Sequence, residues 1–184
     1  VSPSITQPGM ILPFDIGETW YYTGGPHGGW DSGSAWAALD FAPPGEFGCA
    51  TSPLWVVAMA SGLVVRAENG AVILDLDNDG YEQTGWVNLY MHIAAEDRIE
   101  AGQYIFAGER IGHASCEGGY SNATHVHIAR KFNGEWIAAD GPLPFNLEGW
   151  VSSGTGREYD GFITNGSQSI EALDRADELN QITR

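Results

Sequence analysis

Short runs of apolar and β-branched residues, separated by turns rich in glycine, proline and asparagine, recur along most of the chain. Because strands favour β-branched and aromatic residues, such runs predict short β-strands. No sustained helical period occurs before Trp150. The predicted strands cover 34–42, two short stretches within 55–66, then 71–76, 86–93, 104–106, 110–112, 124–130 and 135–138. The sequence therefore predicts an all-β domain.

Asn-Gly dipeptides mark two of the predicted turns. Asn69-Gly70 precedes the run 71–76, and Asn133-Gly134 precedes the run 135–138. Asparagine and glycine adopt the positive φ angles that tight hairpin turns require. The runs 71–76 and 86–93 are expected to pair as a hairpin on either side of a polar insert.

Two segments depart from this strand pattern. Proline and glycine interrupt any period over 7–30, which is predicted to be loop-like. Over 167–184, apolar residues spaced by multiples of three lie among charged ones, which predicts a short C-terminal amphipathic helix. A linker to a further segment is the alternative for this tail.

The charge of the chain excludes some partners. Its 184 residues include 24 Asp and Glu but only 8 Lys and Arg, giving a formal charge of −16 with Lys131 as the one lysine. Such a balance disfavours nucleic acid and anionic membrane surfaces. No run of about 18 apolar residues occurs, so no membrane span is expected. The length suits one domain-sized core, and a monomer is the simplest expectation.

The two cysteines, Cys49 and Cys116, match no C-x-x-C metal or redox spacing. One long-range disulfide is expected if the protein is exported, and two buried thiols are the alternative. The near absence of lysine and the loops rich in Trp, Tyr and Gly favour export. The expected location is therefore extracellular or in the cell envelope.

A few histidines and one aspartate carry the candidate chemistry. His125 and His127 flank one residue of an apolar run, so strand alternation places both imidazoles on one side, about 7 Å apart. Asp40 lies in another apolar run, and no Lys or Arg precedes Arg66. Since a buried carboxylate needs a partner, a divalent cation is expected. Two imidazoles and a carboxylate are usual ligands of catalytic zinc; a solvated Asp40 is the alternative.

The pattern His27-x12-Asp40 with a distant His125-x-His127 resembles the lysostaphin-type zinc peptidoglycan endopeptidases. The long first gap resembles the branch of the staphylolytic LasA protease and the β-lytic metalloprotease. Residues 51–62, 87–93 and 101–112 are similar, in order, to segments of that family. The resemblance implies an antiparallel β-sheet sandwich or open barrel whose long loops wall a groove. It also implies a zinc metallopeptidase domain over 1–150 and an extension over 151–184.

The resemblance further implies roles for individual residues. The implied zinc ligands are His27, Asp40 and His127, and the implied unligated catalytic histidines are His92 and His125. Tyr90 is expected on the strand face of His92, where its hydroxyl could reach the site; core packing is the alternative. The implied substrate is a peptidoglycan peptide or another glycine-rich peptide. A non-catalytic peptidoglycan-binding or regulatory module on the same fold is the alternative function.

A second candidate metal site lies in the polar insert. Its acids stand at alternate positions before Gly80, as in the start of a calcium loop, and they are Asp75, Asp77 and Asp79. Trp86 occupies the position where an EF-hand has glutamate, which excludes an EF-hand. A hairpin loop that binds calcium and a solvated hairpin tip both remain compatible with this spacing.

Overall fold

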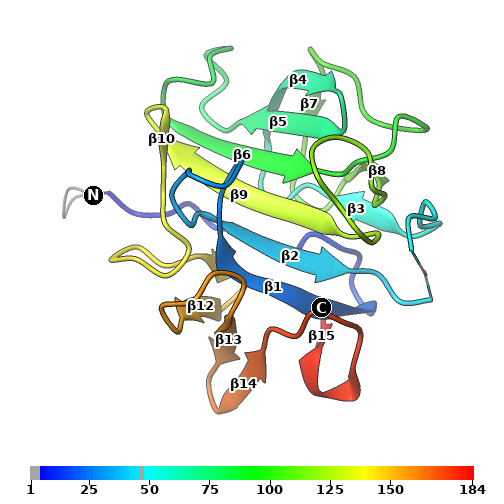
Figure 1. Ribbon diagram of the computed structural model, residues 1–184. Helices are drawn as coiled ribbons and strands as arrows, with labels where there is room; N and C mark the ends of the chain where they lie inside the picture. Colours follow the sequence, from blue (N-terminus) through cyan, green and yellow to red (C-terminus); the bar gives the residue numbers. More distant parts are fainter. Residues whose placement is uncertain (1–4, 46–47) are drawn as a thin grey trace.

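A nine-stranded antiparallel sheet crosses the centre of the structure, a computed structural model that describes residues 5–45 and 48–184 (Figure 1). Its main path runs β15-β1-β2-β9-β6-β5-β4-β7, and β10 pairs with β9. The strands of this sheet are β1 (Thr19–His27), β2 (Ala38–Ala42), β4 (Gly62–Glu68), β5 (Ala71–Asp75), β6 (Trp86–Met91), β7 (Tyr104–Ile105), β9 (Val126–Phe132), β10 (Glu135–Trp136) and β15 (Gln181–Thr183).

Two smaller sheets complete the fold. One has the order β11-β12-β13-β14, and the other pairs β3 with β8. Their strands are β3 (Trp55–Val57), β8 (Arg110–His113), β11 (Asn146–Leu147), β12 (Trp150–Gly154), β13 (Gly161–Asn165) and β14 (Gln168–Glu171). The prediction of an all-β, antiparallel fold is confirmed.

The described part of the chain contains no helix with the length and apolarity needed to span a bilayer.

The Asn-Gly turns behave as predicted. Asn69 and Gly70 have φ angles of 51° and 78° between β4 and β5, and Asn133 and Gly134 have 49° and 79° between β9 and β10. The predicted β5–β6 hairpin is confirmed by its register, in which Ile73 lies opposite Leu89. The local turn chemistry therefore fixes two of the strand connections in the large sheet.

Strand β1 corrects the prediction of a loop over 7–30. Trp20 and Tyr22 of this strand are fully buried, and the Trp20 ring stacks on Phe14 with centroids 5.0 Å apart. The glycines that suggested a loop lie instead at irregularities in the pairing with β2, where the register shifts on both sides of Gly24. A central strand tolerates these glycines because its neighbours approach them closely.

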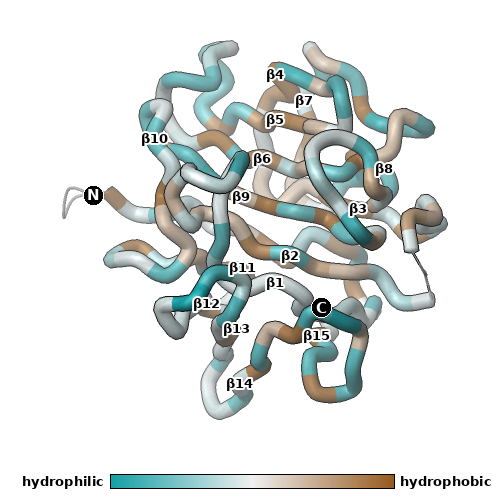
Figure 2. Tube along the Cα trace, in the orientation of Figure 1, coloured by the Kyte–Doolittle hydropathy of each residue, from teal (hydrophilic) through white to brown (hydrophobic). Residues whose placement is uncertain are grey.

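The two faces of the large sheet carry different side chains. Val126 and Ile128 of β9 join the main core, whereas Ala129 joins a smaller apolar cluster on the opposite face. Apolar colours follow the strands, and polar colours dominate the loops at the margins (Figure 2). By strand alternation, His127 and Lys131 share the face of Ala129, which we call the site face. The fold thus separates the main core from the candidate chemistry.

The predicted helix over 167–184 is wrong. Ile170 lies opposite Ile163 in the β14–β13 pair, and Ile182 lies opposite Trp20 in the β15–β1 pair. Between these strands, the three-residue 3₁₀ helix η1 (Glu178–Asn180) has Leu179 77% exposed. The apolar residues spaced by multiples of three belong to strand β14, the turn at η1 and strand β15. Pairing of these strands with β13 and β1 outweighed the weak helical pattern.

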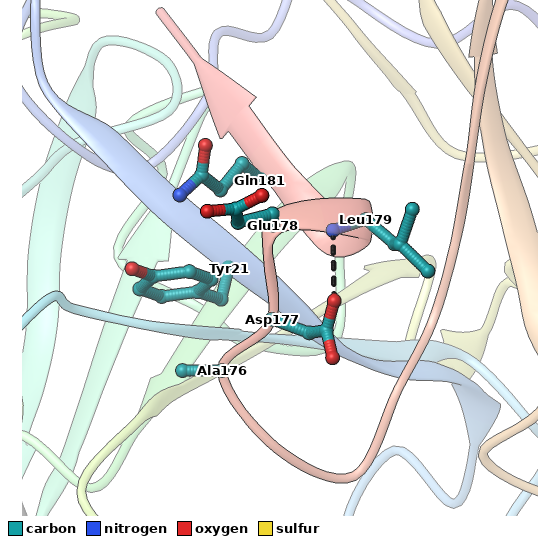
Figure 3. Close-up of a pocket in the computed structure, with 6 residues that line it drawn as sticks. All are labelled: Tyr21, Ala176, Asp177, Glu178, Leu179 and Gln181. Atoms are coloured by element: carbon teal, nitrogen blue, oxygen red, sulfur yellow. Dashed lines mark hydrogen bonds between the residues drawn. The ribbon is translucent and has the colours of Figure 1, made fainter.

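A pocket of about 570 Å³ borders this turn (Figure 3). Asp177 accepts a hydrogen bond from the Leu179 backbone N–H at 3.0 Å, which caps η1. The pocket is lined by Tyr21, Ala176, Asp177, Glu178, Leu179 and Gln181. None of the candidate site residues lines this pocket.

The predicted disulfide between Cys49 and Cys116 is present. It joins the segment after β2 to the loop that precedes β9, across a sequence separation of 67 residues. Thr124 in the same loop donates its backbone N–H to the Gly48 carbonyl at 2.7 Å. The bridge therefore anchors a loop that carries part of the candidate site.

Replacing both cysteines, as Cys49→Ser with Cys116→Ser, should destabilise the protein by about 4 kcal/mol through the lost loop closure. This corresponds to a fall in Tm of about 10 °C for a domain of this size. Thermal unfolding followed by circular dichroism measures the change. Dithiothreitol should lower the Tm of the wild type to that of the double variant and leave the variant unchanged. Insensitivity of the wild type to the reductant would contradict the disulfide.

Candidate metal centre

Three neighbouring strands bring the predicted metal ligands together on the site face (Figure 1). Asp40 in β2 lies directly opposite His127 in β9 and Gly24 in β1, and His27 ends β1. Residues directly opposite in an antiparallel pair project to the same face. The ligand atoms of His27, Asp40 and His127 all lie within 4.8 Å of one another. The structure therefore assembles the set that the sequence suggested.

The polar side-chain atoms of His27, Asp40 and His127 lie close together. Asp40 Oδ1 lies 3.2 Å from His27 Nε2 and 3.2 Å from His127 Nδ1, and these two nitrogens are 3.0 Å apart. All three side chains are buried. Asp40 Oδ1 has no hydrogen-bond partner among the described residues.

The outer nitrogens of both imidazoles are held by backbone carbonyls. His27 Nδ1 lies 2.7 Å from the Gly25 oxygen, and His127 Nε2 lies 3.0 Å from the Gly29 oxygen. Because a carbonyl only accepts, these nitrogens carry the protons in the neutral rings. His27 Nε2 and His127 Nδ1 then direct lone pairs toward Asp40. Metal-binding histidines are commonly oriented in this way, and a divalent cation would relieve the repulsion among the three donors.

The charges around Asp40 favour its ionised form. Burial alone would raise the pKa of this carboxyl, but the charges of His27 and His125 hold it well below its usual range. Burial alone would lower the pKa of His27, but the Asp40 carboxylate outweighs it and raises that pKa. The centre therefore presents an anionic oxygen beside imidazole nitrogens, which suits a cation.

Gly24 makes space for the Asp40 carboxylate. A Cβ atom at position 24 would lie 2.6 Å from Asp40 Oδ2 and 2.9 Å from its Cβ. Atoms at this separation cannot coexist without displacement, so only glycine allows the observed position of the carboxylate. The glycine that obscured β1 in the sequence is thus a packing requirement of the site.

The two remaining predicted histidines lie beside the three candidate ligands. His125 Nε2 is 3.7 Å from Asp40 Oδ1, and the rings of His92 and His125 have centroids 4.5 Å apart. Their Nδ1 atoms also face backbone carbonyls, that of Glu117 at 3.0 Å for His92 and that of Ala123 at 2.8 Å for His125. In their neutral forms, both rings therefore keep Nε2 unprotonated.

His92 reaches the site because its backbone leaves the strand geometry. Its φ angle is 68°, in the left-handed region, immediately after β6 ends at Met91. Ser115 fixes this conformation by donating its backbone N–H at 2.8 Å and its hydroxyl at 2.9 Å to the His92 carbonyl. Burial and the nearby His125 lower the pKa of His92 to about 4. The ring is therefore neutral at neutral pH.

Comparison with known proteins decides the family. Residues 40–139 match the sequence profile described as Peptidase family M23, which is more than half of the chain. The chain belongs to peptidase family M23. The predicted resemblance is confirmed. The matched range includes Asp40, His92, His125 and His127, whereas His27 precedes it.

Individual relatives agree with this assignment. The M23 chain is 25% identical over 139 residues to Protease LasA of Pseudomonas aeruginosa strain PAO1, a match that covers 72% of this chain and 31% of LasA. The chain therefore spans less than a third of the length of that relative. The structure of the M23 metalloprotease pseudoalterin, from the deep sea, has a TM-score of 0.73 at 22% identity and covers 98% of this chain and 99% of its own.

A third similar protein is a zinc-containing peptidase from Vibrio cholerae. Its TM-score is 0.51 at 14% identity, over 75% of this chain and 41% of its own. At these identities, both structural likenesses concern the fold of the M23 domain.

Tyr90 is placed differently from the expectation. It lies opposite Ile128, so it projects into the main core, away from the site face. Its hydroxyl accepts a hydrogen bond from the Met59 backbone N–H at 2.7 Å, and its side chain is fully buried. The prediction that Tyr90 shares a face with His92 is wrong, because the left-handed backbone of His92 reverses the alternation at that position.

Tyr159 lies beside the candidate metal centre and was not among the residues predicted from the sequence. Its ring stacks on His27 with centroids 4.2 Å apart and planes at 20°. The Tyr159 carbonyl accepts from the Gly25 N–H at 2.9 Å, and its own N–H donates to the Pro26 carbonyl at 3.1 Å. It comes from the β12–β13 connection, where the sequence signals only a turn. The 151–184 segment therefore contributes directly to the surroundings of His27.

The acidic insert forms a hairpin tip. Asp75 Oδ1 accepts from the Asp77 N–H at 3.2 Å, and Asp75 Oδ2 accepts from the Gly80 N–H at 2.8 Å. Asp77 and Asp79 are exposed, although all three carboxylates lie within 4.8 Å. Calcium binding at this loop therefore stays a prediction.

The substitution Gly24→Ala should lower the affinity for a divalent metal ion by at least tenfold, because its methyl group would displace the Asp40 carboxylate. Competition with a chromogenic chelator measures the affinity. Gly9→Ala is a matched control, since a Cβ at Gly9 meets nothing within 4 Å. Equal affinities in the two variants would show that the Asp40 position does not matter for metal binding.

Proposed function

We propose that this chain is a zinc-dependent metalloendopeptidase that hydrolyses peptide bonds in peptidoglycan stems or cross-bridges. Membership of peptidase family M23 supports the peptidase chemistry. The observation that carries the proposal is the convergence of three possible ligand atoms, from His27, Asp40 and His127, beside the rings of His92 and His125. The proposed peptidase domain spans 1–150, and the extension 151–184 adds Tyr159 and the edge strand β15.

The donor set fits zinc by its chemistry. Two imidazole nitrogens and one carboxylate oxygen are usual for a catalytic zinc ion, and they would be His27 Nε2, Asp40 Oδ1 and His127 Nδ1. The buried Asp40 Oδ1, which has no hydrogen-bond partner in residues 5–45 and 48–184, matches this group. When bound, zinc supplies a Lewis acid for the scissile carbonyl and a nucleophilic water at neutral pH.

His92 is the proposed general base. Its Nδ1–H donates to the Glu117 carbonyl, so Nε2 is free to accept a proton. Its low pKa ensures that the ring is unprotonated before reaction. General bases of this kind contribute about 10² to 10⁴ in rate.

His125 is the proposed partner of His92. Its Nδ1 faces the Ala123 carbonyl, which orients Nε2 toward the centre, 3.7 Å from Asp40 Oδ1. Protonated at Nε2, the ring could stabilise negative charge that develops on the scissile carbonyl oxygen. The two unligated rings thus divide proton acceptance and charge stabilisation.

The substrate assignment draws on the family resemblance and on charge. The resemblance implies a preference for small residues such as glycine, and an extracellular or cell-envelope location. A chain of charge −16 is repelled by anionic wall polymers, which lowers encounter rates at low salt. A glycine-rich peptide of an extracellular protein is therefore a second candidate substrate.

Two substitutions separate metal binding from turnover. His127→Ala should abolish both zinc binding and cleavage, because it removes a proposed ligand. His92→Ala should keep zinc and lose about 10² to 10⁴ in kcat, because it removes the proposed base. Zinc content is measured by mass spectrometry of the purified protein, and cleavage on a panel of cross-linked muropeptides.

His113→Ala is the matched control. His113 is also buried, but its Nδ1 donates to the Leu54 carbonyl at 2.9 Å, and its ring packs on Trp55, away from the three proposed ligands. This variant should keep both zinc and cleavage. Equal zinc loss in the His92 and His127 variants would contradict the ligand assignment, and a zinc-free wild type without cleavage would contradict the proposed function.

A further inference from the structure

The connection between β8 and β9 supplies the two carbonyls that orient the unligated histidines. His92 Nδ1 donates to the Glu117 carbonyl at 3.0 Å, and His125 Nδ1 donates to the Ala123 carbonyl at 2.8 Å. Each carbonyl belongs to the residue just inside one end of the segment 116–124, which we call the orienting loop. The positions of both rings therefore depend on the conformation of this loop.

Both ends of the orienting loop are tied to the same short segment of the chain. Cys116 is bridged to Cys49. At the other end, Thr124 is buried, and its backbone N–H donates to the Gly48 carbonyl at 2.7 Å. The Thr124 hydroxyl also donates to the Ala50 carbonyl. Three consecutive residues after β2 thus hold the loop at its two ends.

Few other bonds fix the shape of the orienting loop. Within residues 5–45 and 48–184, no backbone N–H group of 116–123 donates to a backbone carbonyl, and most of these residues are exposed. The Glu117 carboxylate lies 4.0 Å from Arg98 Nη1, and a partly exposed ion pair of this length contributes little. Gly118 packs closely on the Asn69 carbonyl without a hydrogen bond. The loop therefore depends mainly on its two end ties.

The first tie also lies beside the residue that fixes the backbone of His92. Ser115, directly before Cys116, donates its N–H at 2.8 Å and its hydroxyl at 2.9 Å to the His92 carbonyl. The Ser115 Oγ atom accepts from the Glu117 N–H at 3.0 Å. The residues on either side of the bridged Cys116 therefore hold both the backbone and the ring of His92.

The proposed metal ligands are oriented from a different part of the chain. The carbonyls that face His27 and His127 belong to Gly25 in β1 and to Gly29 in the loop after it. Neither glycine lies in the orienting loop or in the segment tied to it. Loosening the orienting loop should therefore disturb the two unligated rings and leave the ligand rings in place.

We propose that the Cys49–Cys116 bridge and Thr124 are positioning residues for His92 and His125, which they serve by holding the two orienting carbonyls. The proposal rests on the peptidase function proposed above. It assigns the two ties to turnover and not to metal binding. A displacement of about 1 Å in a catalytic group can cost about 10² in rate, so loss of a tie should be visible in kcat.

The double variant Cys49→Ser with Cys116→Ser tests the covalent tie, at a temperature well below its Tm. We expect kcat on cross-linked muropeptides to fall about 10²-fold, while KM changes by less than about twofold and the zinc content equals that of the wild type. Ile105→Ala is the matched control for lost stability, because it empties a core position on β7, at the end of the large sheet. This control should keep the wild-type kcat.

Thr124→Val tests the second tie and keeps the proposal testable if the cysteine variant does not fold. Valine retains the size of the side chain but leaves the Ala50 carbonyl without this donor. We expect kcat to fall about tenfold at an unchanged zinc content. Thr19→Val is the matched control, because its hydroxyl pairs with that of Thr183 at the start of β1. It should keep the wild-type kcat.

NMR of the histidine rings tests the positioning without any turnover. Long-range proton–nitrogen spectra, recorded at a pH at which the rings are neutral, show which ring nitrogen carries the proton. In the wild type, His92 and His125 should each show a single Nδ1–H tautomer. In the double cysteine variant, both rings should show a mixture of tautomers, whereas His27 and His127 should keep their wild-type tautomers.

These measurements decide the proposal in either direction. Wild-type tautomers and a wild-type kcat in the double cysteine variant would overturn it. An equal fall of kcat in Ile105→Ala, or loss of zinc in step with kcat, would also overturn it, since the bridge would then serve stability alone. A wild type that cleaves no muropeptide would refute the peptidase function, and the NMR spectra would still decide whether the bridge positions the rings.

Discussion

The structure depends on one buried carboxylate oxygen, Asp40 Oδ1, which faces imidazole nitrogens and has no hydrogen-bond partner within the part of the chain that the structure describes. An ionised carboxylate in such a place is costly unless a cation compensates it. The surrounding chain makes room for the Asp40 carboxylate in two ways. Position 24 has no side chain, and the pairing of β1 with β2 is irregular on both sides of Gly24. These features have a common explanation if the centre holds a divalent metal ion.

Backbone carbonyls orient the rings of all four site histidines in the same way. Each has one ring nitrogen against a backbone carbonyl and the other directed inward, and the carbonyls belong to Gly25, Gly29, Glu117 and Ala123. Backbone atoms of strands and bridged loops move little, so they hold the rings before any ligand arrives. The rings differ in their charge surroundings: Asp40 raises the pKa of His27, whereas burial lowers that of His92.

Sequence patterns were informative where the strands are regular. Strand alternation predicted His125 and His127 on one side, and both rings lie beside Asp40 Oδ1. The Asn-Gly turns correctly located two hairpins. The same alternation failed at Tyr90, because the positive φ of His92 is set by Ser115, a residue 23 positions away. The glycines of β1 led to the prediction of a loop. The atoms that crowd Gly24 and Gly25 belong to β2 and to the start of β13, which the local sequence does not indicate. Tyr159 was missed for the same reason: only the tertiary fold brings it to His27.

The most direct test of the account is anomalous diffraction from crystals of the purified protein, collected above and below the zinc absorption edge. The account predicts a single zinc peak in contact with His27 Nε2, Asp40 Oδ1 and His127 Nδ1, with His92 and His125 outside the ligand set. A centre without zinc, or a zinc ion ligated by His92 or His125 in place of Asp40, would contradict it.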